Sequence, residues 1–301
     1  MRNVEMARRI ERMPVADPLR FAIAGDSGAW SDPTADAIFA ELVRQIAHVR
    51  PAFFVNLGDF AGPGTLARHQ DYLRLVQPLR MPNLCVVGNH DVDDPAGRDV
   101  WERVHGPMNF SFGHGHTRFV AIHAASRPGR HYRREPPEAV RGPRREDLDY
   151  LDRTLGAAAE RNRVVLMHMP PYLDGRYRPH ENWGFGRHER DFLDLLRSHQ
   201  VRLVCCAHGL AFDTHVRDGT RFVMSGGGGS GLCSHLRGIC TEGEGAPEDR
   251  GALFHFVEIS IGADGDVSGR VVQAFADPST TRFAFGNAWP TGVKARTRCR
   301  S

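Results

Sequence analysis

The sequence contains almost no lysine. Lys294 is the single lysine among 39 basic residues, so nearly all of the positive charge is carried by arginine. The formal net charge of +3 is too small to indicate a nucleic-acid partner, because binding to a phosphate backbone needs a strongly basic surface. We therefore interpret most of the arginines as ordinary surface residues.

The scarcity of lysine also bears on a run of four glycines at Gly226–Gly229. No lysine lies directly after this run, as a phosphate-binding P-loop requires, so the run is not a P-loop. Two interpretations stay open. The run is either a solvent-exposed linker or a turn in which the backbone bends sharply or approaches another segment closely.

Long hydrophobic runs and paired cysteines are missing as well. No segment approaches the roughly 18 consecutive apolar residues of a membrane-spanning helix, and the start, Met1 to Met6, holds no apolar stretch of the secretion-signal type. The six cysteines form no Cys-x-x-Cys pair, which argues against a structural zinc site. We expect a cytoplasmic protein without membrane contact.

The remaining composition is that of an ordinary folded domain. Hydrophobic residues make up 41% and charged residues 25% of the 301 positions, so a large core can form. No internal repeat or linker is visible. We predict one domain over residues 1–301, with a core from about 19 to 275 and peripheral arms at 1–18 and 276–301.

The most informative stretch is Gly88-Asn89-His90-Asp91. It follows the apolar run Asn83–Val87, which is typical of a buried strand. In an open α/β sheet, ligands bind at the carboxyl ends of the strands. Asn89 offers a neutral oxygen to a cation, and His90 can transfer a proton near neutral pH. By itself, this stretch could also be a polar turn that ends a strand.

Four other predicted strands end in the same manner. The first two end in Gly25-Asp26 and Gly58-Asp59, and two later ones end in His168 and His208. Predicted helices separate the first three strands, and this β-α-β order brings their carboxyl ends to one edge of a sheet. The recurrence favours a site over a set of unrelated turns.

Together, the strand ends supply carboxylates, one carboxamide and imidazoles. These residues are Asp26, Asp59, Asn89, His90, Asp91, His168 and His208. This mixture of oxygen and nitrogen ligands suits manganese, iron or zinc.

The order and the context of these motifs resemble the calcineurin-like metallophosphoesterases, which include purple acid phosphatases and bacterial cyclic-nucleotide phosphodiesterases. The resemblance covers about Leu19 to Gly229. It implies an α/β fold of four layers (αββα), in which two mixed sheets are flanked by helices. It also implies two metal ions bridged by Asp59.

The resemblance assigns a role to each residue of the motifs. Asp26 would hold the first metal, and Asn89, His168 and His208 would hold the second one together with Asp59. His90 would be the general acid that protonates the leaving group, with Asp91 orienting its imidazole, and metal-bound water would be the nucleophile.

The sequence departs from the family pattern at the first metal. The positions that usually supply its histidine or tyrosine hold Gly28 and Gly62, and the last histidine of the pattern is replaced by Leu210. We therefore expect one tightly bound divalent ion (Mn, Fe or Zn) and a second site that is weak or empty. Asp213 or His215 could replace the missing ligands, or could simply be strand residues.

A loop from Tyr172 to Arg187 lies between two ligand-bearing strands. Its side chains Arg178, His180 and Trp183 are candidates for substrate binding, because arginine suits phosphate oxygens and tryptophan stacks on rings. The predicted function is hydrolysis of a small soluble phosphate ester. Two alternatives stay open, namely a one-metal enzyme with non-phosphate chemistry and a non-catalytic binder of a phosphorylated ligand. The oligomeric state is not predicted.

Overall fold

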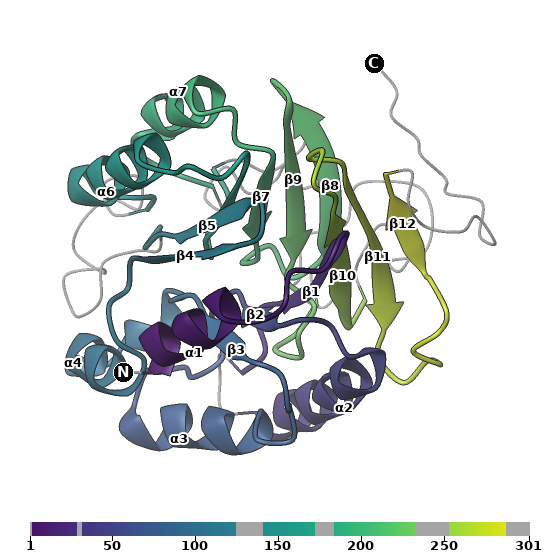
Figure 1. The fold of residues 1–301 in the computed structure, drawn as a ribbon. Coiled ribbons are helices and arrows are strands. Elements are labelled where there is room, and N and C mark those ends of the chain that lie inside the picture. Colours follow the sequence, from purple (N-terminus) through teal and green to yellow (C-terminus); the bar gives the residue numbers. More distant parts are fainter. Residues whose placement is uncertain (1, 29–31, 125–140, 172–183, 233–252, 287–301) are drawn as a thin grey trace, which may run out of the picture.

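The computed structural model describes residues 2–28, 32–124, 141–171, 184–232 and 253–286. Two six-stranded sheets pack against each other, and helices cover their outer faces (Figure 1). The first sheet has the order β12-β11-β10-β1-β2-β3 and the second the order β4-β5-β6-β7-β9-β8. The four-layer α/β fold predicted from the motifs is confirmed.

The strands of the first sheet are β1 (Leu19–Ala24), β2 (Phe54–Asn56), β3 (Asn83–Cys85), β10 (His255–Ile261), β11 (Val267–Gln273) and β12 (Phe283–Phe285). Those of the second sheet are β4 (Phe110–His114), β5 (Thr117–Ala121), β6 (Asn162–Leu166), β7 (Leu203–Cys206), β8 (Phe212–Arg217) and β9 (Thr220–Ser225). Both sheets are mixed. β1, β2 and β3 are parallel to one another, as are β5, β6 and β7. β10 pairs with β1 in antiparallel fashion, and β4 does so with β5.

The described helices are α1 (Arg2–Glu11), α2 (Pro33–Val49), α3 (Leu66–Leu75), the 3-10 turn η1 (His90–Val92), α4 (Gly97–Val104), α6 (Arg145–Gly156) and α7 (Glu189–Ser198). In Figure 1, α2 and α3 lie outside the first sheet, and α6 and α7 lie outside the second. None of these helices is long and apolar enough to cross a bilayer.

Helix α2 shows how local sequence sets an element. Asp32 caps its first turn by accepting a hydrogen bond from the Thr34 amide at 2.8 Å, and Pro33 occupies the first helical position. Ile38, Leu42 and Ile46 recur at helical spacing and are buried against the first sheet. The sequence predicts a helix that starts at Asp32-Pro33 and runs to about Val49, and these boundaries are confirmed.

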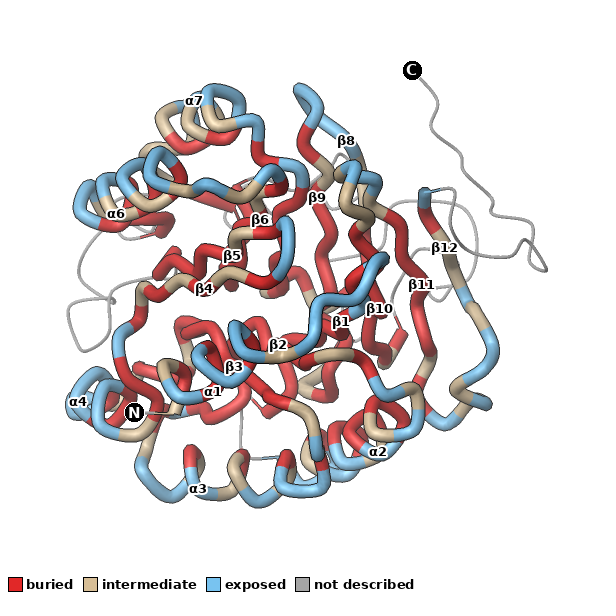
Figure 2. The backbone as a smooth tube through the Cα atoms, viewed as in Figure 1, coloured by how far each residue is buried: buried red, intermediate tan, exposed pale blue. Residues whose placement is uncertain are grey.

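The core between the two sheets is strongly aromatic. Phe21 and Phe53 of the first sheet stack with their ring centroids 5.2 Å apart, and Phe112 and Phe119 of the second stack at 4.8 Å. Edge-to-face contacts join the two pairs across the interface, for example Phe53 and Phe119 at 5.4 Å. In Figure 2, the strands on the two sides of this core are coloured mostly as buried.

The N-terminal segment is not a loose arm, contrary to the prediction for residues 1–18. Helix α1 lies against β3 and β4 and buries Met6, Ala7 and Ile10 in the core between the sheets. The side chain of Asn3 bonds the backbone of Cys85 twice, donating to its carbonyl oxygen at 2.8 Å and accepting from its amide at 3.0 Å. An amide side chain thus satisfies the open edge of β3 as a further strand would.

The core also extends beyond residue 275, the predicted limit, because β12 pairs with β11. The alternation of apolar and polar residues over 214–216, 222–225, 254–261 and 267–275 predicts one antiparallel layer, and this prediction is wrong. The hairpin of β8 and β9 completes the second sheet, whereas β10 and β11 belong to the first. Alternation of apolar and polar residues identifies a strand but not the sheet it joins.

Candidate metal centre

The predicted ligands converge at one edge of the two sheets. Asp26 and Asp59 follow the carboxyl ends of β1 and β2, and Asn89 follows β3. His168 and His208 follow β6 and β7 of the facing sheet. Parallel strands present their carboxyl ends at one edge, so the site is assembled from both sheets.

Three of these side chains form a compact group. One ligand atom each of Asp59, His168 and His208 lies within 4.8 Å of the others. His168 Nε2 is 3.2 Å from Asp59 Oδ2 and 3.2 Å from His208 Nδ1. The other ring nitrogen, Nδ1, is 2.8 Å from the Leu57 carbonyl oxygen, which requires a proton on Nδ1 and points Nε2 at the centre.

Asn89 supplies a second sign of a cation. Its Oδ1 is buried and has no hydrogen-bond partner in the described part of the chain. The next residue, His90, donates its backbone N–H to Asp59 Oδ1 at 2.9 Å, so the Asn89 loop rests directly on the Asp59 side chain. A buried carbonyl oxygen without a donor is costly, and a cation would satisfy it. The residues present therefore fit a divalent metal.

The backbone around the centre is strained. Asp26, Asp59 and His208 have φ values of 57°, 57° and 66°, in the left-handed region that residues with a side chain rarely adopt. Gly58 has a φ of 101°, and a Cβ there would lie 2.7 Å from His168 Nδ1. A Cβ at Gly88 would collide with the Asp59 side chain. The glycines thus allow the ligand loops to approach each other.

The glycine run 226–229 is a place of close backbone approach and not a solvent linker. Gly228 donates its N–H to the Gly25 carbonyl oxygen at 2.8 Å, and Ser230 donates to the Asp26 carbonyl oxygen at 2.8 Å. A Cβ at Gly226 would lie 2.8 Å from Asp26 Oδ2. The run therefore packs against the end of β1 and supports Asp26.

Asp26 itself is buried, and its Oδ2 accepts a hydrogen bond from the His208 amide at 2.7 Å. The position of the first missing ligand, Gly28, has no room for a side chain, because a Cβ would lie 2.5 Å from the Phe60 carbonyl oxygen. Asp213 and His215 lie on β8 and are not among the converging metal ligands of the described residues. The structure thus shows no replacement for the first-metal ligands in these residues.

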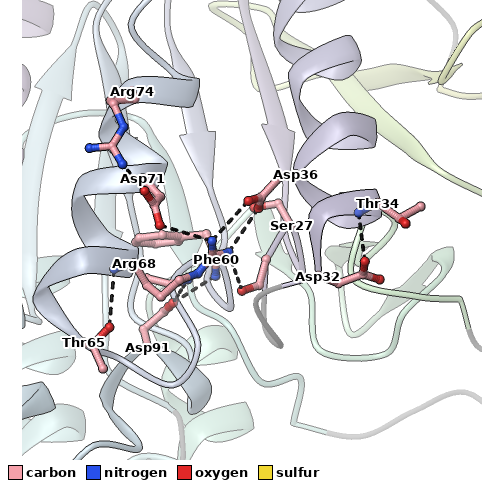
Figure 3. A network of polar contacts seen from close by, with 12 residues as sticks. Ser27, Asp32, Thr34, Asp36, Phe60, Thr65, Arg68, Asp71, Arg74 and Asp91 are labelled. Carbon is pink, nitrogen blue, oxygen red and sulfur yellow. Dashed lines mark hydrogen bonds and ion pairs between the residues drawn. The ribbon is translucent and has the colours of Figure 1, made fainter.

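An arginine closes the space beside Gly28. Arg68 Nη2 is 3.4 Å from the Gly28 carbonyl oxygen and 3.0 Å from Asp36 Oδ1. Its Nη1 is 3.4 Å from Asp71 Oδ2. Figure 3 shows this guanidinium between the two carboxylates, from α2 and α3, where it ties both helices to the loop after β1.

Asp91 does not orient His90, contrary to the prediction. Its carboxylate is buried and accepts hydrogen bonds from four backbone amides, those of Gly88, Asp59, Phe60 and Ala61, at 2.8–2.9 Å. The partner of His90 is Asp93, whose Oδ2 lies 2.6 Å from His90 Nδ1. Asp91 therefore fixes the ligand loops, and Asp93 holds the imidazole.

The electrostatics of the centre reflect its burial and its crowded charges. Burial raises the pKa of Asp26 to about 8, although the charge of His168 opposes this rise. Burial also opposes ionisation of Asp59, but the charges of His168 and His90 outweigh it and hold the Asp59 pKa well below its usual range. Burial would lower the pKa of His90 and of His168, but the charge of Asp59 opposes it, and each of these two pKa values is raised to about 9.

His208 differs, because burial and the neighbouring His168 charge lower its pKa to about 3. A nitrogen ligand must be deprotonated to bind a metal, so cation binding competes with the His168 proton. The site should take up its metal more readily as pH rises.

A buried chain of side chains supports the loop from behind. Cys85 Sγ lies 3.2 Å from His105 Nδ1, and His105 Nε2 lies 3.0 Å from His69 Nδ1. His69 Nε2 lies 3.2 Å from the Asp91 carbonyl oxygen. With neutral imidazoles, one direction of donation satisfies every link: thiol to His105, His105 to His69, and His69 to the carbonyl. Nothing in the motif pattern indicated these residues.

The candidate substrate-binding residues Arg178, His180 and Trp183 lie outside the described residues. Two sandwiched mixed sheets with acidic, amide and imidazole groups at the strand ends are the architecture of the metallophosphoesterase fold. In agreement, residues 19–211 match the model of the calcineurin-like phosphoesterase family, and the chain belongs to this family.

A curated relative and several solved structures are similar to the chain. It is 23% identical over 186 residues to a probable cyclic nucleotide phosphodiesterase of Moraxella catarrhalis, which covers 56% of this chain. The match spans 62% of that relative's length.

Among solved structures, purple acid phosphatase PPD1 of yellow lupin has a TM-score of 0.67 at 14% identity, covering 91% of this chain and 54% of that one. A dimetal phosphatase of Danio rerio has a TM-score of 0.63 at 15% identity, covering 90% and 99%. GAP50 of Plasmodium, described as an anchor in the inner membrane complex, has a TM-score of 0.64 at 16% identity, covering 90% and 89%. At such identities the likeness concerns the fold.

Proposed function

We propose that the protein hydrolyses a small phosphate ester with one divalent cation held by Asp59, Asn89, His168 and His208. The observation that carries this proposal is the convergence of the Asp59, His168 and His208 ligand atoms within 4.8 Å. The unpartnered Asn89 Oδ1 beside them supports a fourth ligand. One carboxylate, one amide oxygen and two imidazoles suit manganese, iron or zinc.

When bound, such a cation would polarise the phosphoryl oxygens and activate water as the nucleophile. The protein's own contribution is to hold the ligands in place before the cation arrives. Asp91 does this through its four backbone hydrogen bonds, and the Leu57 carbonyl does it through His168. Asp26 and Asp59 alone would form a weak first site, since Gly28 and Leu210 offer no ligand.

His90 is positioned to protonate the leaving-group oxygen. Its backbone N–H donates to Asp59 Oδ1, and the charge of its imidazole acts on Asp59, which supports a position beside the centre. Asp93 engages Nδ1, so Nε2 is the nitrogen that exchanges a proton with the ester. The side chain is 23% exposed, so a substrate can reach it.

The substrate class follows from the family and from the relatives. Both monoesters and diesters are candidates, because the Moraxella relative is a probable cyclic nucleotide phosphodiesterase and the lupin enzyme is a phosphatase. Arg178, His180 and Trp183 stay proposed contacts to the substrate. A cytoplasmic location stays a prediction from the sequence.

The test is turnover of p-nitrophenyl phosphate, bis-p-nitrophenyl phosphate and a cyclic nucleotide, each with Mn, Fe, Zn or Mg. We expect hydrolysis with at least one metal. On the cyclic nucleotide, whose alkoxide leaving group needs a proton, His90→Ala should lose roughly a hundredfold or more in kcat. His116→Ala, in the exposed turn between β4 and β5, serves as the matched control. Equal activity of the His90 and His116 variants on the cyclic nucleotide would contradict the role of His90.

The incomplete first site favours a second candidate, a binder of a phosphorylated ligand that does not turn it over. If the chain is such a binder, it would bind both the cation and inorganic phosphate but would hydrolyse none of the esters with any metal. A one-metal enzyme with non-phosphate chemistry would also leave the esters intact. Calorimetry on the metal-loaded protein separates these two candidates, because the binder should bind inorganic phosphate and the enzyme with non-phosphate chemistry should not.

A further inference from the structure

A cavity of about 430 Å³ lies at the N-terminal ends of α6 and α7. Basic side chains dominate its wall, namely Arg98, Arg144, Arg145, Arg187, His123 and His188. Glu146 is the acidic residue of the lining. This composition suits an anion.

His123 is the most telling residue of this wall. It is 4% exposed, and among the residues that the structure describes neither Nδ1 nor Nε2 has a hydrogen-bond partner. A neutral imidazole carries one donor and one acceptor, and leaving both unsatisfied in the interior costs free energy. Burial also lowers the pKa of His123 to about 4, so the ring is neutral when the cavity holds no anion. The ring is thus poised to donate to a ligand in the cavity.

Two arginines of the wall, Arg98 and Arg145, are each held by a carboxylate. Arg98 donates a hydrogen bond from Nε to Glu102 at 3.0 Å, and Arg145 donates one from Nη2 to Asp191 at 2.8 Å. A guanidinium has five N–H donors, so each of these pairs leaves several donors for a ligand. Arg144 is more fully engaged, by Asp147.

Two helix N-termini add to the positive potential. Arg144 precedes the first residue of α6 and His188 precedes that of α7, and both line the cavity. The amides of a helix's first turn favour negative charge. Anions bound here would therefore meet guanidinium groups, an imidazole and two helix ends.

The sheet register places this cavity beside the metal centre. Ala121 at the end of β5 pairs with Leu166 at the end of β6, and the Ile122 amide still donates to the Leu166 carbonyl oxygen at 3.1 Å. Two residues after these partners come His123 and His168, respectively. Neighbouring strands lie about 4.8 Å apart, so the two histidines occupy adjacent strand ends.

We propose that this cavity binds a second acidic group of the substrate, a phosphate or a carboxylate, while the ester phosphate lies at the metal centre. The inference rests on the proposed function and narrows it. The substrates would be phosphate esters whose other end is also anionic, such as bisphosphates or phosphorylated acids.

The binding test uses inorganic sulfate as the probe and the metal-free His168→Ala protein, in which the metal centre is disabled. We expect sulfate to bind and to bind roughly tenfold more weakly in Arg98→Gln, since a charge-assisted hydrogen bond is lost. His123→Gln should weaken binding similarly. Arg98 is half exposed, so its variant tests the site even if the buried substitution unfolds the chain.

Arg197→Gln is the matched control, because Arg197 lies on the exposed part of α7 and pairs with Asp194. Sulfate affinity should not change in this variant. Failure of sulfate to bind, or binding that neither Arg98→Gln nor His123→Gln weakens, would overturn the inference.

The kinetic test compares alkanediol bisphosphates and phosphorylated alkanoic acids with alkyl monophosphates of the same chain lengths. We expect a higher kcat/KM for one doubly anionic series at some chain length, and a loss of roughly tenfold of this preference in Arg98→Gln. Which series is preferred distinguishes phosphate from carboxylate. Without turnover of any ester the proposed function fails. Turnover without preference for either series overturns the inference alone.

Discussion

At the scale of single residues, the candidate site shows what a motif can and cannot predict. The motif around Asn89 predicted a carboxamide and an imidazole after a strand, and the backbone of this loop contacts the Asp59 side chain. It did not predict which carboxylate faces the imidazole. In a 3-10 turn, residues three positions apart point the same way, and η1 therefore aligns His90 with Asp93 and turns Asp91 inward.

This geometry makes Asp93 a positioning residue for His90. We expect Asp93→Asn to reduce kcat roughly tenfold for phenyl phosphate, whose leaving group needs a proton. The effect on p-nitrophenyl phosphate should be much smaller, because its leaving group departs without protonation. Asp99→Asn, at an exposed position of α4, is the control. Equal losses on both substrates would assign Asp93 a purely structural role.

Other residues of the site could not have been predicted from sequence. His123, His69 and His105 carry no motif, and a lone histidine in an apolar segment has no assigned function on sequence grounds. Their significance comes from what surrounds them, a basic cavity for His123 and the back of the ligand loop for the other two.

At the scale of elements, apolar periodicity was sufficient for two helices. It predicts helices from Pro33 to about Val49 and from Glu189 to Ser198, and α2 and α7 have these bounds. Helix α1 was missed because its charged residues dominate the composition, although Asn3, Met6, Ala7 and Ile10 follow helical spacing. Its stability comes from packing on two edge strands rather than from local signals.

Removal of the packing of α1 should therefore destabilise the whole protein. Ile10 is fully buried between the sheets. Ile10→Ala should lower the free energy of unfolding by about 2–5 kcal/mol, measured by urea denaturation. Arg8→Ala, at an exposed position of the same helix, should change it by less than about 0.5 kcal/mol. If the two variants were equally stable, α1 would not be part of the core.

At the scale of the whole molecule, the metal centre joins the two sheets. Asp59 belongs to one sheet and His168 and His208 to the other, and a cation would bridge them. The resemblance to a family predicted this convergence of distant strand ends. The resemblance could not predict the basic cavity lined by Arg98, Arg144 and Arg187, because these residues come from segments whose relative positions only the fold determines.

Buried histidines should make the fold sensitive to acid. Burial lowers the pKa of His69 and His255 to about 4, whereas an unfolded chain protonates histidine near pH 6.5. Between these values the unfolded state binds more protons, so stability falls as pH falls from about 6.5 to 4. Each group would contribute roughly 3 kcal/mol to this loss.

The measurement is the free energy of unfolding of the metal-free protein at pH 7, 5.5 and 4.5. His255→Gln should be less stable than the wild type at pH 7, and this difference should shrink towards pH 4.5. His48→Gln, at an exposed position of α2, should follow the wild type throughout. If the difference in free energy of unfolding between His255→Gln and the wild type stayed constant with pH, protonation of His255 would not contribute to the acid sensitivity of the fold.

The most direct test is the metal content of the purified protein. After incubation with Mn, Fe or Zn and removal of loosely bound ions, the wild type should hold about one ion per chain. His168→Ala should hold almost none, because it loses a ligand of the converging group, whereas Asp26→Ala should keep most of the metal. Equal loss of metal in the two variants, or no tightly bound metal in the wild type, would contradict a single cation held by Asp59, Asn89, His168 and His208.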